Sequence, residues 1–303
     1  MSRLALLFPG QGSQFVGMGK ALYEGSSAAR AVFEEADAAL AMPLSRLCFE
    51  GPEEELQRTV NTQPAILTHS VAAFRDLESR APERMEGAVF AAGHSLGEYS
   101  AEVAAGAMSF ADVVRLVRRR GLFMQEAVPA GLGAMAAIVG LPPEEVEAVC
   151  REAAEGDIVS PANFNSPEQT VIAGHAAAVA RASAACKARG ARRAIPLAVS
   201  APFHCALMAP ARERLRPLLE EIRLVDPKIP VVTNVDARAE SEAGRLRDAL
   251  RRQVDAPVRW VETVRLLARE GVDRALEIGP GRVLSGLVRR IESGITVENY
   301  GGN

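Results

Sequence analysis

The chain has 303 residues, of which 48% are hydrophobic and 24% charged, a composition typical of a folded globular protein and not of a disordered one. Its 35 basic and 38 acidic side chains give a net charge of −3, which argues against general binding to nucleic acid or to an anionic membrane. The four cysteines and four histidines lack metal-ligand spacing and suggest no disulfide framework. The N-terminal apolar run is too short for a signal peptide, and no segment approaches membrane-spanning length, so we expect a cytoplasmic protein.

Strands alternate with helices along most of the chain, which is typical of a parallel α/β sheet. In chain order the pattern predicts strand Leu4–Phe8, helix Gln63–Phe74, strand Ala88–Ala92, a helix from about Gly97, helix Phe110–Glu126, helix Ala211–Glu221, strand Val231–Thr233, helix Arg245–Arg252, strand Ala275–Ile278 and a last helix after Gly281. The terminal residues Asn299–Asn303 are expected to be loose.

The middle of the chain follows a different order, β-α-β-β-α-β, which is that of a ferredoxin-like unit. The predicted elements are Ala134–Val139, Pro142–Ala154, Ile158–Ala162, Thr170–Ala173, Ala176–Arg189 and Arg193–Val199. We therefore expect an α/β fold with two parts. A ferredoxin-like small subdomain would span residues 129–199, inserted into a large catalytic domain formed by residues 1–128 and 200–303.

A serine lies between an apolar strand and a helix, in the G-x-S-x-G sequence Gly93-His94-Ser95-Leu96-Gly97. A nucleophilic serine on such a turn needs glycines around it, because the strained backbone leaves no room for Cβ atoms. The backbone amide of Leu96, at the start of the helix, could donate to a developing oxyanion. This context favours Ser95 as a nucleophile over an incidental serine in a tight turn.

His204 is the best candidate for the base that a nucleophilic serine requires. His69 and His175 lie in positions more typical of structural or surface residues, and the side chain of His94 should diverge from that of its neighbour Ser95. The acid of a triad is not evident, since Asp112 and Asp157 follow no convincing strand of the large domain. A backbone carbonyl could orient the imidazole instead.

Arg120 falls within the apolar stripe of the helix Phe110–Glu126. A guanidinium cannot lose its charge by deprotonation, so a buried one needs an anionic partner. That partner is either a structural carboxylate or the carboxylate of a substrate, which would then be a dicarboxylic acyl group.

The motifs together resemble those of the malonyl-CoA:acyl carrier protein transacylases, and the resemblance covers essentially the whole chain. They are Phe8-Pro9-Gly10-Gln11-Gly12-Ser13-Gln14, Asn61-Thr62-Gln63-Pro64-Ala65, Gly93-His94-Ser95-Leu96-Gly97-Glu98-Tyr99-Ser100, Arg120-Gly121, Asn163-Phe164-Asn165-Ser166-Pro167, His204 and Gly279-Pro280-Gly281. The resemblance implies an α/β-hydrolase-like large domain with a mostly parallel sheet and a ferredoxin-like small one.

The resemblance also implies roles for individual residues. Ser95 would be the acylated nucleophile, His204 its base and Arg120 the clamp on the malonyl carboxylate. The backbone amides of Gln11 and Leu96 would form the oxyanion hole.

Four further positions complete the site that the resemblance implies. The main-chain carbonyl of Gln253 would orient the histidine, which would account for the missing acid. Gln63 and Asn165 would contribute to the substrate site. Phe203 accompanies selection of malonyl over methylmalonyl groups in related transferases, although many free-standing members carry serine there, so a polyketide assignment stays open.

The expected function is therefore transfer of a malonyl group from malonyl-CoA, through malonyl-Ser95, to the phosphopantetheine thiol of holo-acyl carrier protein. No cofactor or metal is expected, and fatty acid or polyketide synthesis would use the product. Basic residues of the small lobe (Lys187, Arg189, Arg192 and Arg193), with Arg118 and Arg119, could steer the acidic carrier protein. Two alternatives stay open: a serine thioesterase or esterase on the same frame, and a catalytically idle scaffold that binds carrier proteins.

Overall fold

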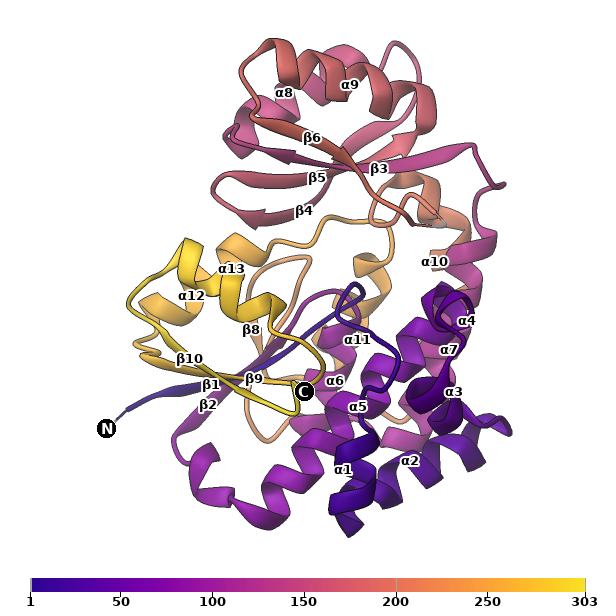
Figure 1. The fold of residues 1–303 in the computed structure, drawn as a ribbon. Coiled ribbons are helices and arrows are strands. Elements are labelled where there is room, and N and C mark those ends of the chain that lie inside the picture. The colour runs from indigo at the N-terminus through magenta and orange to yellow at the C-terminus, as the bar shows by residue number, and fades with distance from the viewer. Residues whose placement is uncertain (1, 200, 303) are drawn as a thin grey trace.

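A six-stranded sheet forms the centre of the larger domain in the computed structural model, which describes residues 2–199 and 201–302 (Figure 1). The strand order is β10-β9-β1-β2-β7-β8. Neighbouring strands run parallel except β7 and β8, which are antiparallel. The strands are β1 Leu4–Phe8, β2 Ala88–Gly93, β7 Val231–Val232, β8 Ala239–Glu240, β9 Arg274–Ile278 and β10 Thr296–Tyr300. The prediction of a mostly parallel sheet is confirmed.

Strand β1 is buried on both faces, which explains why all its residues are apolar. Leu4, Leu6 and Phe8 join the main core on one face of the sheet, whereas Ala5 and Leu7 join a smaller core on the other. Successive side chains of a strand point to opposite faces, so helices must cover both sides. Two helices, α12 Trp260–Arg269 and α13 Val283–Ile291, cover the second face.

The main core is enclosed by helices from both halves of the chain. They are α1 Lys20–Gly25, α2 Ser27–Leu40, α3 Leu44–Glu50, α4 Glu53–Gln57, α5 Thr59–Arg80, α6 Leu96–Ala104, α7 Phe110–Glu126, α10 Ala209–Glu221 and α11 Ala243–Gln253, with the short 3-10 helices η1 Pro82–Met85 and η2 Ala206–Met208. Helices α1 to α4 were not predicted, although α2 has 14 residues.

A second sheet of four antiparallel strands, at the top of Figure 1, forms the smaller domain. Its order is β4-β5-β3-β6, and α8 and α9 pack on one face. The elements are β3 Gly133–Val139, α8 Pro143–Ala153, β4 Val159–Ser166, β5 Gln169–His175, α9 Ala176–Ala188 and β6 Arg193–Pro196. The predicted β-α-β-β-α-β order is confirmed. The domain limits 129–199 stay a prediction, and Ser200, where the large domain was expected to resume, lies outside the described residues, as do Met1 and Asn303.

Several predicted boundaries are wrong. Strand β4 continues to Ser166, past the predicted end at Ala162, because it keeps pairing with β5, and β6 ends at Pro196, before the predicted end at Val199. Helix α5 begins at Thr59, before Pro64, because side-chain hydrogen bonds hold its first turn: Thr62 Oγ1 donates to Leu56 O at 2.6 Å and Asn61 Nδ2 to Glu55 O at 2.8 Å. It also runs on to Arg80, past the predicted end at Phe74.

The prediction for the C-terminal segment is also wrong, since Asn299 and Tyr300 are part of β10. Asn299 Nδ2 donates to Glu277 Oε2 at 2.9 Å, and the Tyr300 hydroxyl donates to Asp76 Oδ2 at 2.7 Å. These side-chain contacts fix the segment that the sequence analysis expected to be loose.

Two helical glycines test how tightly β1 packs against α6. A Cβ on Gly97 would lie 2.0 Å from the carbonyl oxygen of Phe8, whereas one on Gly286 in α13 would meet nothing within 4 Å. We expect Gly97→Ala to lower the free energy of unfolding by about 3 kcal/mol or more, because backbone atoms cannot give way. Gly286→Ala should leave it unchanged or raise it by up to about 1 kcal/mol. Urea denaturation measures both, and equal midpoints for the two variants would contradict the packing described.

Candidate active site

Ser95 occupies a strained turn between β2 and α6. Its backbone has φ 52° and ψ −103°, a conformation that few non-glycine residues adopt. A Cβ on Gly93 would lie 2.0 Å from the Gly97 backbone, and one on Gly10 would lie 2.3 Å from the carbonyl oxygen of His94. The turn therefore needs glycine at these positions and presents the serine hydroxyl at the C-terminal edge of the parallel sheet, where open α/β sheets bind ligands.

His204 lies next to this hydroxyl, with Nε2 2.7 Å from Ser95 Oγ. Its Nδ1 lies 2.9 Å from the carbonyl oxygen of Gln253 and 3.2 Å from that of Ala256. Carbonyl oxygens only accept, so Nδ1 carries the proton and donates, which leaves Nε2 free to accept from the serine. The contact with Gln253 that the resemblance implied is present.

Neither aspartate considered as a triad acid contacts His204. Asp157 pairs with Arg181 at 3.0 Å, and Asp112 accepts from the Ser109 hydroxyl at 2.6 Å. Backbone carbonyls therefore do the orienting work that a carboxylate does in a Ser-His-Asp triad.

Arg120 reaches the same point from α7, and its side chain is 1% exposed. Nη2 donates to Ser95 Oγ at 3.2 Å and to Gln253 Oε1 at 2.9 Å, and Nη1 donates to Gln63 Oε1 at 2.8 Å. The guanidinium also lies 5.3 Å from the centre of the Tyr99 ring. The prediction that Arg120 lies in the apolar stripe and is buried is confirmed.

The partners of Arg120 are uncharged. Among residues 2–199 and 201–302, no ion pair joins it to a carboxylate, and its Nε has no hydrogen-bond partner. Of the two partners left open by the sequence, the structural carboxylate is therefore not found at contact distance. A buried cation held by amide oxygens beside a nucleophile can accept an anionic ligand.

Burial and the charge of Arg120, with a smaller effect of His94, lower the pKa of His204 to about 3. The imidazole is thus neutral, as a general base must be, even at a pH far below the ordinary pKa of histidine. A cavity of about 410 Å³ between β4 and α12 reaches His204.

The remaining predicted residues surround this centre, and their roles stay predictions. Gln63 accepts a hydrogen bond from Arg120. Phe203, which precedes His204 in the sequence, is buried. Asn165 accepts from His94 Nε2 at 2.8 Å. Leu96 begins α6 directly after the serine. Gln11 follows Gly10, which packs against the serine turn.

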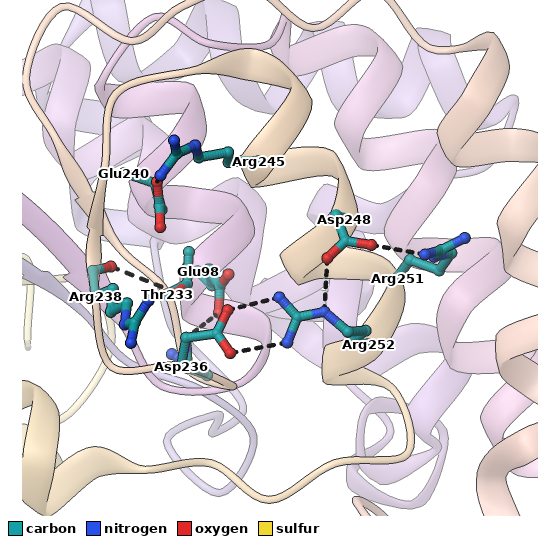
Figure 2. Close-up of polar contacts among 10 residues, drawn as sticks. Glu98, Thr233, Asp236, Arg238, Glu240, Arg245, Asp248, Arg251 and Arg252 are labelled. Carbon is teal, nitrogen blue, oxygen red and sulfur yellow. Dashed lines mark hydrogen bonds and ion pairs between the residues drawn. The ribbon is translucent and has the colours of Figure 1, made fainter.

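Two residues of the site were missed by the sequence analysis. Asn234 Oδ1 accepts from the Ser95 backbone N–H at 2.6 Å, and its Nδ2 donates to Gly93 O at 2.7 Å. Glu98, fully buried in α6, accepts from the Asn234 backbone N–H at 2.9 Å, within the polar network drawn in Figure 2. A signal existed for Asn234, because it follows the predicted strand Val231–Thr233 and so lies at the edge where Ser95 ends its own strand.

Among the described residues, no group of three or more histidine, cysteine, aspartate or glutamate side chains could hold a metal ion. None of the described helices combines the length and the apolarity needed to cross a membrane.

Comparison with known proteins identifies the family of this site. Residues 5–297 match the family model described as "Acyl transferase domain". The malonyl CoA-acyl carrier protein transacylase of Escherichia coli K12 is 52% identical over 299 residues, which cover 98% of this chain and 95% of that protein. The Bacillus subtilis transacylase is 51% identical, covering 96% of this chain and 91% of that one. The chain belongs to the malonyl CoA-acyl carrier protein transacylase family and is an acyltransferase.

Solved structures of this acyltransferase family agree with the fold described above. An acyl carrier protein S-malonyltransferase from Vibrio cholerae superposes with a TM-score of 0.96 at 47% identity, covering 100% of this chain and 98% of that one. A malonyl-transacylase in complex with its type II PKS acyl-carrier protein superposes with a TM-score of 0.96 at 50% identity, covering 100% of this chain and 97% of that one. The expected α/β-hydrolase-like and ferredoxin-like domains are confirmed.

The low pKa of His204 predicts how the reactivity of Ser95 depends on pH. Protonation of the base would make the rate of inactivation by an uncharged serine reagent, such as phenylmethylsulfonyl fluoride, fall tenfold per pH unit. Because His204 stays neutral, we expect no such fall between about pH 7 and about pH 5. In Arg120→Ala the loss of the nearby cation should raise the pKa of His204 and move the acid limb to higher pH. A wild-type midpoint at the ordinary histidine pKa of 6.5 would contradict this account of the base.

Proposed function

We propose that this acyltransferase moves a malonyl group from malonyl-CoA to the phosphopantetheine thiol of holo-acyl carrier protein, for fatty acid or polyketide synthesis. The observation that carries the proposal is Arg120, a buried cation 3.2 Å from Ser95 Oγ that no described carboxylate pairs with. A malonyl group has a free carboxylate one carbon away from the carbonyl that the serine attacks. The same pocket can thus bind the charge and present the reactive carbon.

The first half-reaction forms the acyl-enzyme. Ser95 Oγ attacks the thioester carbonyl while His204 Nε2 takes the hydroxyl proton, and the Gln253 carbonyl holds the resulting imidazolium in place. The backbone N–H groups of Gln11 and Leu96 would stabilise the oxyanion, as the resemblance implies. The tetrahedral intermediate then expels the coenzyme A thiolate, which recovers the proton from His204.

The second half-reaction runs the same steps in reverse order. The phosphopantetheine thiol gives its proton to His204 and attacks the malonyl-serine carbonyl. The tetrahedral intermediate then breaks its bond to Ser95 Oγ, which takes the proton back from His204, and the malonyl thioester leaves. Double displacement of this kind needs one nucleophile, one base and one oxyanion site, all of which Ser95 and its neighbours can provide. The chain's own residues account for every proton transferred, and we propose no cofactor.

The two alternatives are less well supported. A thioesterase or esterase has no use for a buried arginine 3.2 Å from its nucleophile. A catalytically idle scaffold would not need Ser95 and His204 held 2.7 Å apart at a strained turn. Both observations favour acyl transfer.

Some of the basic side chains that could steer the carrier protein already have partners within this chain, and others do not. On the small domain Arg189 pairs with Glu152 and Arg192 with Glu168, which reduces their attraction for an acidic partner. Arg118 donates to Asn61 Oδ1 at 3.2 Å. Lys187 and Arg193 form no ion pair with another described residue, so we propose them as the first steering residues to test on this domain.

Intact-protein mass spectrometry tests the proposed function directly. After brief exposure to malonyl-CoA the protein should gain the mass of one malonyl group, and holo-acyl carrier protein should remove it. Ser95→Ala should gain nothing. Loss of the label in buffer alone, as fast as with carrier protein, would instead support the thioesterase, and failure of the wild type to take up any label would support the idle scaffold.

Arg120→Ala tests the proposed carboxylate clamp. We expect kcat/KM for malonyl-CoA to fall by about a hundredfold or more, because a buried charged hydrogen-bonded pair is lost in the transition state. The variant should lose much less with acetyl-CoA, which has no carboxylate to bind. The ratio of kcat/KM values for the two thioesters is the quantity to measure. An unchanged ratio would falsify the clamp.

A further inference from the structure

A buried carboxylate that the steps above do not use lies directly beneath the serine turn. Glu98 is 0% exposed, and its Oε2 accepts from the Asn234 backbone N–H at 2.9 Å and from Gln253 Nε2 at 2.8 Å. The other oxygen, Oε1, is buried and has no partner among the described residues. One oxygen of this carboxyl group thus makes all the contacts, and the other is free to carry a proton.

The Gln253 side chain connects Glu98 to Arg120. Its Nε2 donates to Glu98 Oε2 and, at 3.0 Å, to the Ser95 carbonyl oxygen, while its Oε1 accepts from Arg120 Nη2 at 2.9 Å. An ionised carboxylate only accepts, so Glu98 turns the amino end of the amide toward itself and the oxygen toward the arginine. Glu98 therefore sets the orientation in which Gln253 holds Arg120.

The charges near Glu98 leave it as the counter-charge of Arg120. Asp236, one of two acidic groups near Glu98, forms a two-pronged ion pair with Arg252, at 2.8 and 2.6 Å, which Figure 2 shows beside Glu98. Glu102, one turn further along α6, is fully buried, and burial with the neighbouring charge of Glu98 raises its pKa well above the ordinary value. Asp236 is thus already paired with a cation, and burial disfavours the charged form of Glu102, whose pKa is raised.

Two other titratable groups face this cluster and stay uncharged. Burial raises the pKa of Tyr99, so its hydroxyl keeps its proton. His204 is neutral because burial and Arg120 lower its pKa to about 3. Burial raises the pKa of Glu98 itself to about 7, so this carboxyl group can change its charge near neutral pH.

We propose that Glu98 balances the charge of Arg120 in the free enzyme and takes up a proton from solvent when a malonyl carboxylate replaces it as the partner of that arginine. The inference rests on the proposed function. The incoming carboxylate stays ionised, and the proton comes to rest on Glu98 Oε1, so that Oε2 keeps its hydrogen bonds to Asn234 and Gln253. The buried site then holds one cation and one anion both before and after loading, and malonyl binding is linked to proton uptake.

The first experiment counts protons during acylation. Wild-type enzyme is mixed with malonyl-CoA near pH 8 in weak buffer with a pH indicator, and malonyl-serine is quantified in the same samples by intact mass. We expect the wild type to take up most of one proton for each malonyl group loaded. Glu98→Gln, which has the shape of the protonated carboxyl group, should take up none. Glu102→Gln, at a buried carboxyl group that makes no hydrogen bond to a described residue and does not contact Gln253, should behave like the wild type.

The outcomes separate this inference from the proposed function. No malonyl label on the wild type would contradict the function itself. Label without proton uptake, or equal uptake in the wild type and Glu98→Gln, would overturn the role of Glu98 alone. If Glu98→Gln does not fold, the wild-type measurement still decides, since uptake supports the inference and its absence overturns it.

The pH dependence of KM distinguishes this positioning role from a merely structural one. In the wild type the KM for malonyl-CoA should rise with pH above about 7, by up to tenfold per pH unit, because an ionised Glu98 competes for Arg120. In Glu98→Gln the KM should be independent of pH in this range and lower than that of the wild type near pH 9. A KM that is higher in the variant at every pH would contradict the inference.

Discussion

A cation enclosed by protein, with no carboxylate at contact distance among the described residues, is the constraint on which the whole site depends. Arg120 is 1% exposed and has only oxygen atoms of neutral groups as hydrogen-bond partners. Burying such a charge costs free energy unless an anion pairs with it. Placing this cation beside the nucleophile favours a thioester with a free acid end, because its carboxylate can contact the guanidinium directly and a neutral acyl group cannot.

The fold keeps the remaining parts of the site close to this cation. Strand β2 and helix α6 meet at Ser95. The backbone around this turn packs so closely against Gly93, Gly97 and Gly10 that no side chain fits at these positions. Gln253, at the end of α11, supplies its carbonyl to His204 and its side chain to Arg120. Through this one residue the orientation of the base and that of the cation are fixed together, so the acid of a serine triad is not needed.

The sequence predicted those features that depend on local pattern. The strand–turn–helix context identified Ser95, and helical periodicity placed Arg120 in the apolar stripe. It did not predict the contact of Asn234 with the serine turn or the partners of Glu98, because both depend on contacts between distant segments. Strand β10 was missed because it is an edge strand with polar residues and no alternating pattern, and the start of α5 because Pro64 usually marks the first turn of a helix.

The proposed selectivity depends on what Arg120 binds. The most direct measurement is a crystal structure of Ser95→Ala with malonyl-CoA, in which the thioester cannot react. We expect both terminal nitrogens of the guanidinium to donate to the two oxygens of the malonyl carboxylate, with the thioester carbonyl beside residue 95. A carboxylate found in solvent or on another side chain, with Arg120 still held only by Gln63 and Gln253, would contradict the proposed basis of selectivity.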